Sequence, residues 1–336
     1  GTAMIVAFFL TGLPELFPSV VPIVGKKLAL IVLWWVLGRF SFWFMDYFGV
    51  LFTAIINVGL MAYISYLAAI PAFKDRNKKH VSLAYSMVSI VIIQALFFAS
   101  ELKILEINSY EILLLSLILV LVLIFLALRR VSMESINELL EQEKIDDTFL
   151  AKSFRYNLVI FCLLLYGFVE FFFPNNSTLA YICFACGASV LAILNDFILK
   201  DNNILFKPFV LYIVTTILLT SIGFFFLGFN YLFELNVTNH FRHFITTGTF
   251  GMVFYVIMII VSTIHTGREI FTNLYLTIGL MLIIISTFIR AFIPYYFEYS
   301  MILYILSSIL WAIPFVIYIK IFFPFLLKPR ADGIKG

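Results

Sequence analysis

Long apolar stretches alternate with short polar breaks along the whole chain. The hydrocarbon core of a bilayer is about 30 Å thick, so a helix needs about 20 apolar residues to cross it. The pattern therefore predicts an all-α fold, a polytopic transmembrane helical bundle that forms a single transmembrane domain over residues 1–336. We place the spans at 28–45, 50–72, 81–100, 110–128, 155–173, 178–199, 208–229, 243–264, 271–292 and 300–323.

The first apolar run is shorter than the others. It covers residues 1–13 and ends at a turn around Pro14. A helix of that length reaches only about 20 Å, less than the hydrocarbon core requires. We therefore expect that the chain begins inside a helix and that its true N-terminus is missing. On this count the chain holds about eleven spans, the first of them partial.

The composition supports a membrane protein and excludes several other classes. Hydrophobic residues make up 63% of the chain and charged residues 12%, whereas soluble domains carry about 25% charged residues. The net charge is only +3, and no basic block is long enough to indicate nucleic-acid binding. The chain contains no Walker loop, no HExxH and no nucleophile elbow. Hydrolytic and nucleotide-driven chemistry therefore lack support, and whether the protein is an enzyme stays open.

The basic residues predict the orientation of the chain in a lipid bilayer. Most of the 22 lysines and arginines fall in every second polar break, and the opposite breaks hold only Lys103, Arg242 and Arg290. Because positive charge is retained in the cytoplasm, the basic C-terminal tail is predicted to be cytoplasmic. One break on the same side, residues 129–154, is long, charged and rich in helix-forming residues. We expect this cytoplasmic loop to form either a short interfacial helix on the membrane surface or a solvated linker.

Three of the four histidines are grouped around a single predicted span. His240 and His243 lie at its outer end and His265 at its inner end. His243 and His265 are separated by about 33 Å of helix and share one face to within about 40°. They cannot bind one metal ion, but each could serve a separate site completed by other helices. The alternative is that both are interfacial residues with a hydrogen-bond partner.

The sequence HFITTGTFG that begins at His243 is rich in small residues. Small side chains allow another helix or a flat cofactor to come close to the backbone. The remaining histidine, His80, closes the basic loop KDRNKKH and is expected to be solvated.

A few other polar side chains fall inside predicted spans, where each is a candidate for function. Arg39 lies about halfway through its helix, and Asp46 follows on the same face. They could form a structural pair, line a ligand or proton path, or contact partners on other helices. Asn57 and Gln94 are expected to form interhelical hydrogen bonds. Cys183 and Cys186 lie one turn apart, a spacing that would suit Cu(I), although buried cysteines usually serve packing.

Six segments, in order along the chain, resemble the NnrS family, bacterial membrane proteins of the response to nitric oxide. They are FFLTGLPELFP followed by LWWVLGRF, the basic loop FKDRNKKH, HFITTGTFGM, HTGRE and the ending LLKPRADGIKG. Together they extend over essentially the whole chain. The family has about twelve spans, with a histidine-bearing part near the N-terminus that this chain lacks. The resemblance therefore implies that the chain is an eleven-span part of a twelve-span fold.

The resemblance also implies haem b and copper held in the bacterial inner membrane, with nitric oxide as a small-molecule ligand. Carried over by motif, His243 and His265 are the candidate ligands, with His240 as a further metal candidate. Arg268 matches the HTGR motif and Arg39 the arginine of the GR pair. The family's glycine-rich stretch near residue 130 reads RRVSM here, so no role is assigned to it.

The resemblance implies a role in resistance to nitrosative stress. The main alternative is a secondary transporter of a small solute or metal, for which the intramembrane Arg39 would be suited. A membrane sensor or assembly factor is a third reading, although no soluble output domain is visible in the sequence.

Overall fold

A computed structural model describes residues 2, 5–7, 9–10, 20–75, 81–174, 176–199, 206–269, 271 and 273–333. His80 and the expected turn around Pro14 lie outside these residues. The chain is 83% helical, and its described part contains no strand, so the all-α prediction is confirmed. The elements are α2 (Gly25–Trp43), α3 (Met45–Phe48), α4 (Val50–Lys74), α5 (Val81–Glu101), α6 (Ser109–Gln142), α7 (Ser153–Phe172), α8 (Thr178–Ala192), η1 (Ile193–Phe197), α9 (Pro208–Leu232), α10 (Thr238–Phe241), η3 (Phe244–Thr249), α11 (Phe250–His265), α12 (Leu274–Phe292), η4 (Ile293–Tyr299) and α13 (Ser300–Leu326).

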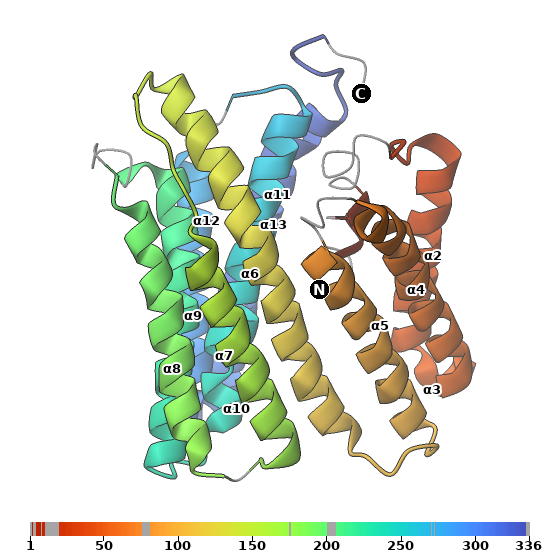
Figure 1. The fold of residues 1–336 in the computed structure, drawn as a ribbon. Coiled ribbons are helices and arrows are strands. Elements are labelled where there is room, and N and C mark those ends of the chain that lie inside the picture. Colours follow the sequence, from red (N-terminus) through yellow and green to blue (C-terminus); the bar gives the residue numbers. More distant parts are fainter. Residues whose placement is uncertain are drawn as a thin grey trace. The chain divides into compact units, whose positions relative to one another are not determined.

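The helices fall into two compact units (Figure 1). Unit 1 comprises residues 1–126 and 167–174, and unit 2 comprises residues 127–166 and 175–336. In unit 1, α4 packs against α2 and α5 around a core that includes Leu60, Ile64 and Met87. Small residues allow the helices to approach closely, since a Cβ on Gly38 of α2 would lie 2.8 Å from Oδ1 of Asn57 in α4.

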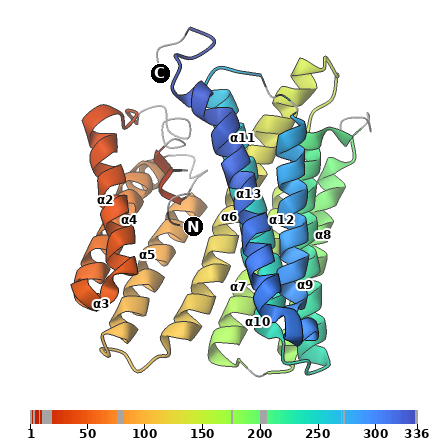
Figure 2. The ribbon, with the colours of Figure 1, turned by 180° about the vertical axis from the view of Figure 1, so that it is seen from behind.

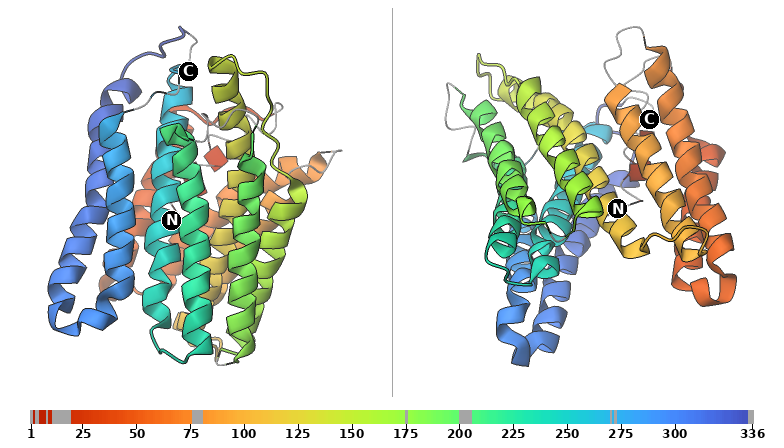
Figure 3. Two further views of the ribbon diagram at one scale, coloured as in Figure 1. Left: turned by 90° about the vertical axis from the view of Figure 1, so that its left-hand side faces the viewer. Right: turned by 60° about the horizontal axis from the view of Figure 1, so that its bottom comes forward.

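Within the described residues, eight helical segments are long and apolar enough to cross a membrane. One of them, Leu274–Leu326, has 53 residues, or about 80 Å of helix, more than twice the thickness of the hydrocarbon core. It consists of α12 and α13, which run side by side and are joined by η4, so it provides two crossings (Figures 2 and 3). Helix α2 coincides with the predicted span 28–45 but is not among the eight, since it carries Lys26, Lys27 and Arg39.

Large apolar side chains point outward from the middle of several helices. Ile55 in α4 and Phe161 in α7 are each 63% exposed. In water such a surface would be unstable, whereas in a bilayer it is solvated by lipid tails. The outward-facing residues therefore support a multi-pass membrane protein.

The segment 129–154 begins as a continuation of a span. Helix α6 passes the expected break after residue 128 and runs to Gln142, a length of about 51 Å. The chain then turns back, and Asn137 of α6 exchanges two hydrogen bonds, of 2.8 and 3.1 Å, with the backbone of Phe149. The first part of this segment is thus helical without a break from the preceding span, and its cytoplasmic position remains a prediction.

Candidate functional site

The histidine-bearing span of unit 2 contains a π-helical turn. Residues Phe244–Thr249 form this turn directly after His243, between α10 and α11. The backbone N–H of Phe250 donates to the carbonyl of Ile245, five residues earlier, which is the hydrogen bond of a π-helix. Such single turns accommodate one extra residue and occur frequently at functional sites. The span is therefore irregular at the position where the histidines lie.

Neighbouring helices hold the π-turn in place. From α9, the hydroxyl of Thr220 lies 2.9 Å from that of Thr249, and both side chains are fully buried. From α13, the indole N–H of Trp311 donates to the carbonyl of Thr247 at 3.1 Å. A π-turn disturbs the regular pairing of backbone carbonyls, so this bond from another helix stabilises the irregular segment.

The predicted close approach at the small residues is confirmed. A Cβ on Gly248 would lie 2.9 Å from Cγ2 of Thr287, and a Cβ on Gly251 would lie 2.6 Å from Nε1 of Trp311. Thr287 belongs to α12 and Trp311 to α13. These two glycines therefore allow other helices to pack against the backbone of this span.

His240 and His243 form a pair at one end of the span. Their ring centroids are 6.2 Å apart and the ring planes are inclined by 72°. Nδ1 of His243 lies 3.3 Å from the hydroxyl oxygens of both Thr246 and Thr247. Nδ1 of His240 is buried and has no hydrogen-bond partner in the described structure. Arg290, near the end of α12, is close enough to act electrostatically on His243.

His265 is the last residue of α11, at the other end of the same span. It is followed by a tight turn in which Gly267 has a φ of +68°, a conformation that favours glycine. Arg268 donates from Nη1 to the carbonyl of Thr266 at 3.1 Å and lies 4.3 Å from the ring centroid of Phe325. The guanidinium of Arg268 in the HTGR motif thus contacts groups of the protein itself.

The C-terminal segment closes over the turn that follows His265. The backbone N–H of Ala331 donates to the carbonyl of Thr266 at 2.9 Å. Arg330 donates to both carboxylate oxygens of Asp332, at 3.0 and 2.6 Å, and these hydrogen bonds raise the pKa of Arg330. The HTGRE motif and residues 330–332 of the C-terminal motif, which lie far apart in the sequence, are therefore in contact.

The π-turn alters the predicted relation between His243 and His265. The expected shared face assumed a regular α-helix between them. One extra residue in the turn changes their angular relation by about 100°. The two histidines still lie at opposite ends of the span, where they cannot bind one metal ion. No group of three or more histidine, cysteine or acidic side chains with metal-binding geometry occurs in the part of the chain that the structure describes.

Arg39 belongs to unit 1, where it contacts Asn57 and Phe42. Its Nη2 donates to Oδ1 of Asn57 at 2.5 Å, and its guanidinium lies 5.1 Å from the ring centroid of Phe42. Of the alternatives predicted for Arg39, a partner on another helix is therefore confirmed, by this bond between α2 and α4. This bond also confirms the interhelical role predicted for Asn57.

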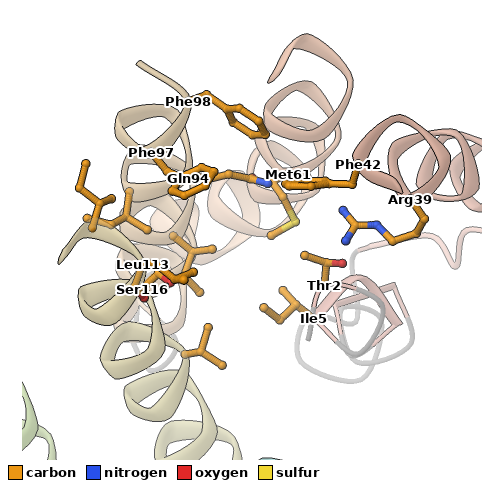
Figure 4. A pocket seen from close by; sticks show the side chains of 14 residues that line it. Thr2, Ile5, Arg39, Phe42, Met61, Gln94, Phe97, Phe98, Leu113 and Ser116 are labelled. Carbon is orange, nitrogen blue, oxygen red and sulfur yellow. Dashed lines mark hydrogen bonds between the residues drawn. The ribbon is translucent and has the colours of Figure 1, made fainter. Parts of the chain in front are cut away.

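Gln94 does not satisfy the corresponding prediction, because its Oε1 is buried and has no partner among the residues that the structure describes. It lines a cavity beside Arg39 (Figure 4). Trp311 and Arg290 were not singled out from the sequence, since neither belongs to a motif. The signal that could have indicated them is the polar or charged group of each inside an apolar span.

The comparison with protein families gives one match. A family model described as NnrS protein matches residues 1–330. No curated protein and no solved structure matches the chain. The matched range contains both ends of the histidine-bearing span, the turn at Gly267 and Arg39.

Proposed function

Since the chain belongs to the NnrS family, we propose that it is a haem- and copper-containing membrane protein of the response to nitric oxide and of resistance to nitrosative stress. The proposal places it in the bacterial inner membrane with a cytoplasmic C-terminus, as the distribution of basic residues predicts. Haem b and copper are the cofactors that the family implies. The observation that carries the proposal is the pair of imidazoles formed by His240 and His243.

The histidine pair fits a single copper ion. His240 and His243 would hold the ion, since their ring centroids lie 6.2 Å apart at the same end of the span. Nδ1 of His240 is buried and has no hydrogen-bond partner in the described structure, so its lone pair could bind a metal. When Nδ1 of His243 donates to Thr246 or Thr247, its Nε2 presents a lone pair. Imidazole nitrogen is a suitable ligand for copper.

Two protein ligands leave coordination positions open, and a copper ion held there would offer nitric oxide a place to bind. The chain's own residues hold and orient the imidazoles. Thr246 and Thr247 contact Nδ1 of His243 and so orient its ring, and these hydroxyls belong to the π-turn. Trp311 stabilises that turn through the carbonyl of Thr247.

The surroundings of His265 fit haem less well. Arg268, the cation available for a propionate in this motif, already contacts Thr266 and Phe325. Asp332 also packs directly against the turn, since a Cβ on Gly267 would lie 2.5 Å from its carboxyl carbon. A haem at His265 therefore rests on the family alone.

The test is metal analysis of the full-length protein purified from membranes. We expect bound copper in the native protein and its loss in His240→Ala and His243→Ala. His265→Ala is the matched control, because it removes an imidazole at the opposite end of the span and should retain copper. A Soret band that weakens in His265→Ala alone would support haem at that end. A native protein without copper, or three variants with equal copper content, would contradict the proposal.

A second variant separates binding from folding. Thr246→Val together with Thr247→Val keeps both imidazoles but removes the hydroxyls that orient His243. Loss of such outer contacts lowers metal affinity by about 10–100-fold. We therefore expect weaker copper binding in a protein that elutes as a single folded species. Unchanged affinity would show that these hydroxyls do not orient a ligand.

A further inference from the structure

Unit 1 contains a cavity of about 270 Å³ among α2, α4, α5 and α6. Most of its wall is apolar, with Phe42, Met61, Phe97 and Phe98 among the lining residues. Figure 4 shows Arg39 and Gln94 extending into it from different helices. No acidic side chain is among the fourteen residues that line it.

Two polar atoms at this cavity lack partners. Nε of Arg39 and Oε1 of Gln94 are both buried, and neither has a hydrogen bond within the described structure. Buried donors and acceptors are almost always paired, because leaving them unpaired inside an apolar region is unfavourable. Both atoms belong to residues that line the same space, so one bound molecule could satisfy them together.

Arg39 is held in position by a hydrogen bond to Asn57. Its Nη2 donates to Oδ1 of Asn57, whose Nδ2 donates to the carbonyl of Thr53 at 2.9 Å and to that of Gly38 at 3.2 Å. These bonds fix the orientation of the Asn57 amide. The guanidinium is therefore anchored at Nη2, while Nε is buried and has no hydrogen-bond partner within the described structure.

The size of the cavity limits what it can hold. At the packing density of protein interiors, about 0.74, a space of 270 Å³ accommodates a molecule of about 200 Å³. An apolar cavity of about 150 Å³ binds benzene, and pockets for drug-sized ligands are about 300–1,000 Å³. The cavity therefore suits a substituted six-membered ring and is too small for a haem macrocycle.

The polar groups indicate the chemistry of that ring. Arg39 only donates hydrogen bonds, so the ligand needs an acceptor oxygen on that side. The amide of Gln94 can present either its carbonyl or its NH₂ group by rotating. A ligand oxygen facing Gln94 could therefore be a carbonyl or a hydroxyl.

We propose that this cavity binds the single-ring headgroup of a membrane quinone, in both its oxidised and reduced forms. One ring oxygen accepts from Nε of Arg39. The opposite oxygen accepts from the NH₂ group of Gln94 when it is a carbonyl, and donates to Oε1 when it is a hydroxyl. Met61 and the phenylalanines contact the apolar ring. A carboxylate amphiphile would pair with Arg39 but fits less well at the other side, because it offers no donor to Oε1 of Gln94.

The test measures binding of duroquinone and durohydroquinone to the full-length protein in lipid nanodiscs. Durene is the matched ligand, since it has the same methylated ring without the two oxygens. We expect saturable binding of both oxygenated forms at one site per chain and binding of durene at least about tenfold weaker. Equal binding of durene, no saturable binding, or displacement of duroquinone by decanoate at equal concentration would overturn the proposal.

The two substituted residues, Gln94 and the control Ser86, both lie on α5. Gln94→Met keeps the length of the side chain and removes the amide, so we expect about tenfold weaker binding of duroquinone. Ser86→Ala lies about two turns away on α5, outside the cavity lining, and should bind as the native protein does. Equal affinities of both variants would contradict the role of Gln94. The measurement involves neither copper nor haem, so this proposal and the proposed function can fail independently.

Discussion

Gly267 and Asp332 are in contact although they lie far apart in the sequence. A Cβ placed on Gly267 would lie 2.5 Å from the carboxyl carbon of Asp332 and 2.7 Å from each of its oxygens. Gly267 also has a φ of +68°. The turn after His265 therefore requires glycine for two separate reasons, its backbone conformation and the absence of space for a side chain.

We predict that Gly267→Ala destabilises the packing of the C-terminal segment on this turn. A side chain at a left-handed φ costs about 1–2 kcal/mol, and displacement of Asp332 adds to this. Limited proteolysis in detergent should release the C-terminal residues faster than in the native protein. Thermal unfolding should also begin at a lower temperature.

Two controls separate the causes. Gly333 has a similar φ of +74°, but no atom lies within 4 Å of a Cβ placed on it. Gly333→Ala should therefore show the backbone penalty alone. Gly267→Ala combined with Asp332→Ala removes the clash and should recover part of the loss. If Gly333→Ala and Gly267→Ala are equally destabilising, the contact with Asp332 does not contribute to the loss of stability.

We predict that Trp311→Phe weakens both the π-turn and the copper site. The change removes the donor to the part-buried carbonyl of Thr247, and the loss of one such hydrogen bond costs about 0.5–1.5 kcal/mol. Thr247 also contacts His243, so copper affinity should fall along with thermal stability. Calorimetric titration with copper and thermal unfolding measure the two effects.

Trp34→Phe is the matched control for this prediction. Trp34 donates its indole N–H to the carbonyl of Ile56 at 2.9 Å within unit 1. Its loss should lower thermal stability by a similar amount and leave copper affinity unchanged. A drop in copper affinity in both variants would indicate general unfolding and no specific role of Trp311.

We predict that Asp196→Asn destabilises unit 2. The side chain of Asp196 is fully buried, pairs with Arg155 and accepts from the backbone N–H of Lys152 at 3.1 Å. Without its negative charge, Arg155 loses its counter-ion, and hydrogen bonds to charged groups contribute about 1.5–3 kcal/mol. Thermal unfolding of the variant in detergent should occur at a lower temperature.

Glu134→Gln tests whether any lost ion pair has the same effect. Glu134 pairs with Arg130 at 2.7 Å, but its side chain is 54% exposed. Exposed pairs contribute at most about 1 kcal/mol, so this variant should resemble the native protein. An equal loss of stability in both variants would show that burial of Asp196 is not the deciding factor.

The positions of most spans could be predicted because their signal is local. An apolar run of about 20 residues must form a helix in a bilayer, whatever surrounds it. The same argument located the ends less well. Helix α6 continues to Gln142 because its polar second half still favours helix, and neither glycine nor proline interrupts it.

The candidate site was predicted only in part. His240, His243 and His265 stood out as rare polar residues at the ends of one span. The π-turn was not predicted, because it depends on Thr220 and Trp311 from helices distant in the sequence. That Oε1 of Gln94 has no partner among the described residues could not be predicted either, because whether it finds a hydrogen-bond donor depends on every neighbouring helix.

The sequence by itself determined the class of the protein, the number and place of most spans and the family to which it belongs. These properties follow from hydropathy and from motifs, which are read along the chain. Only the tertiary structure decided that His240 and His243 form a pair, that Gly267 meets Asp332 and that Arg39 faces a cavity with Gln94. Each of these depends on how the helices pack, because packing determines which faces of the helices are in contact and hence which side chains distant in the sequence become neighbours.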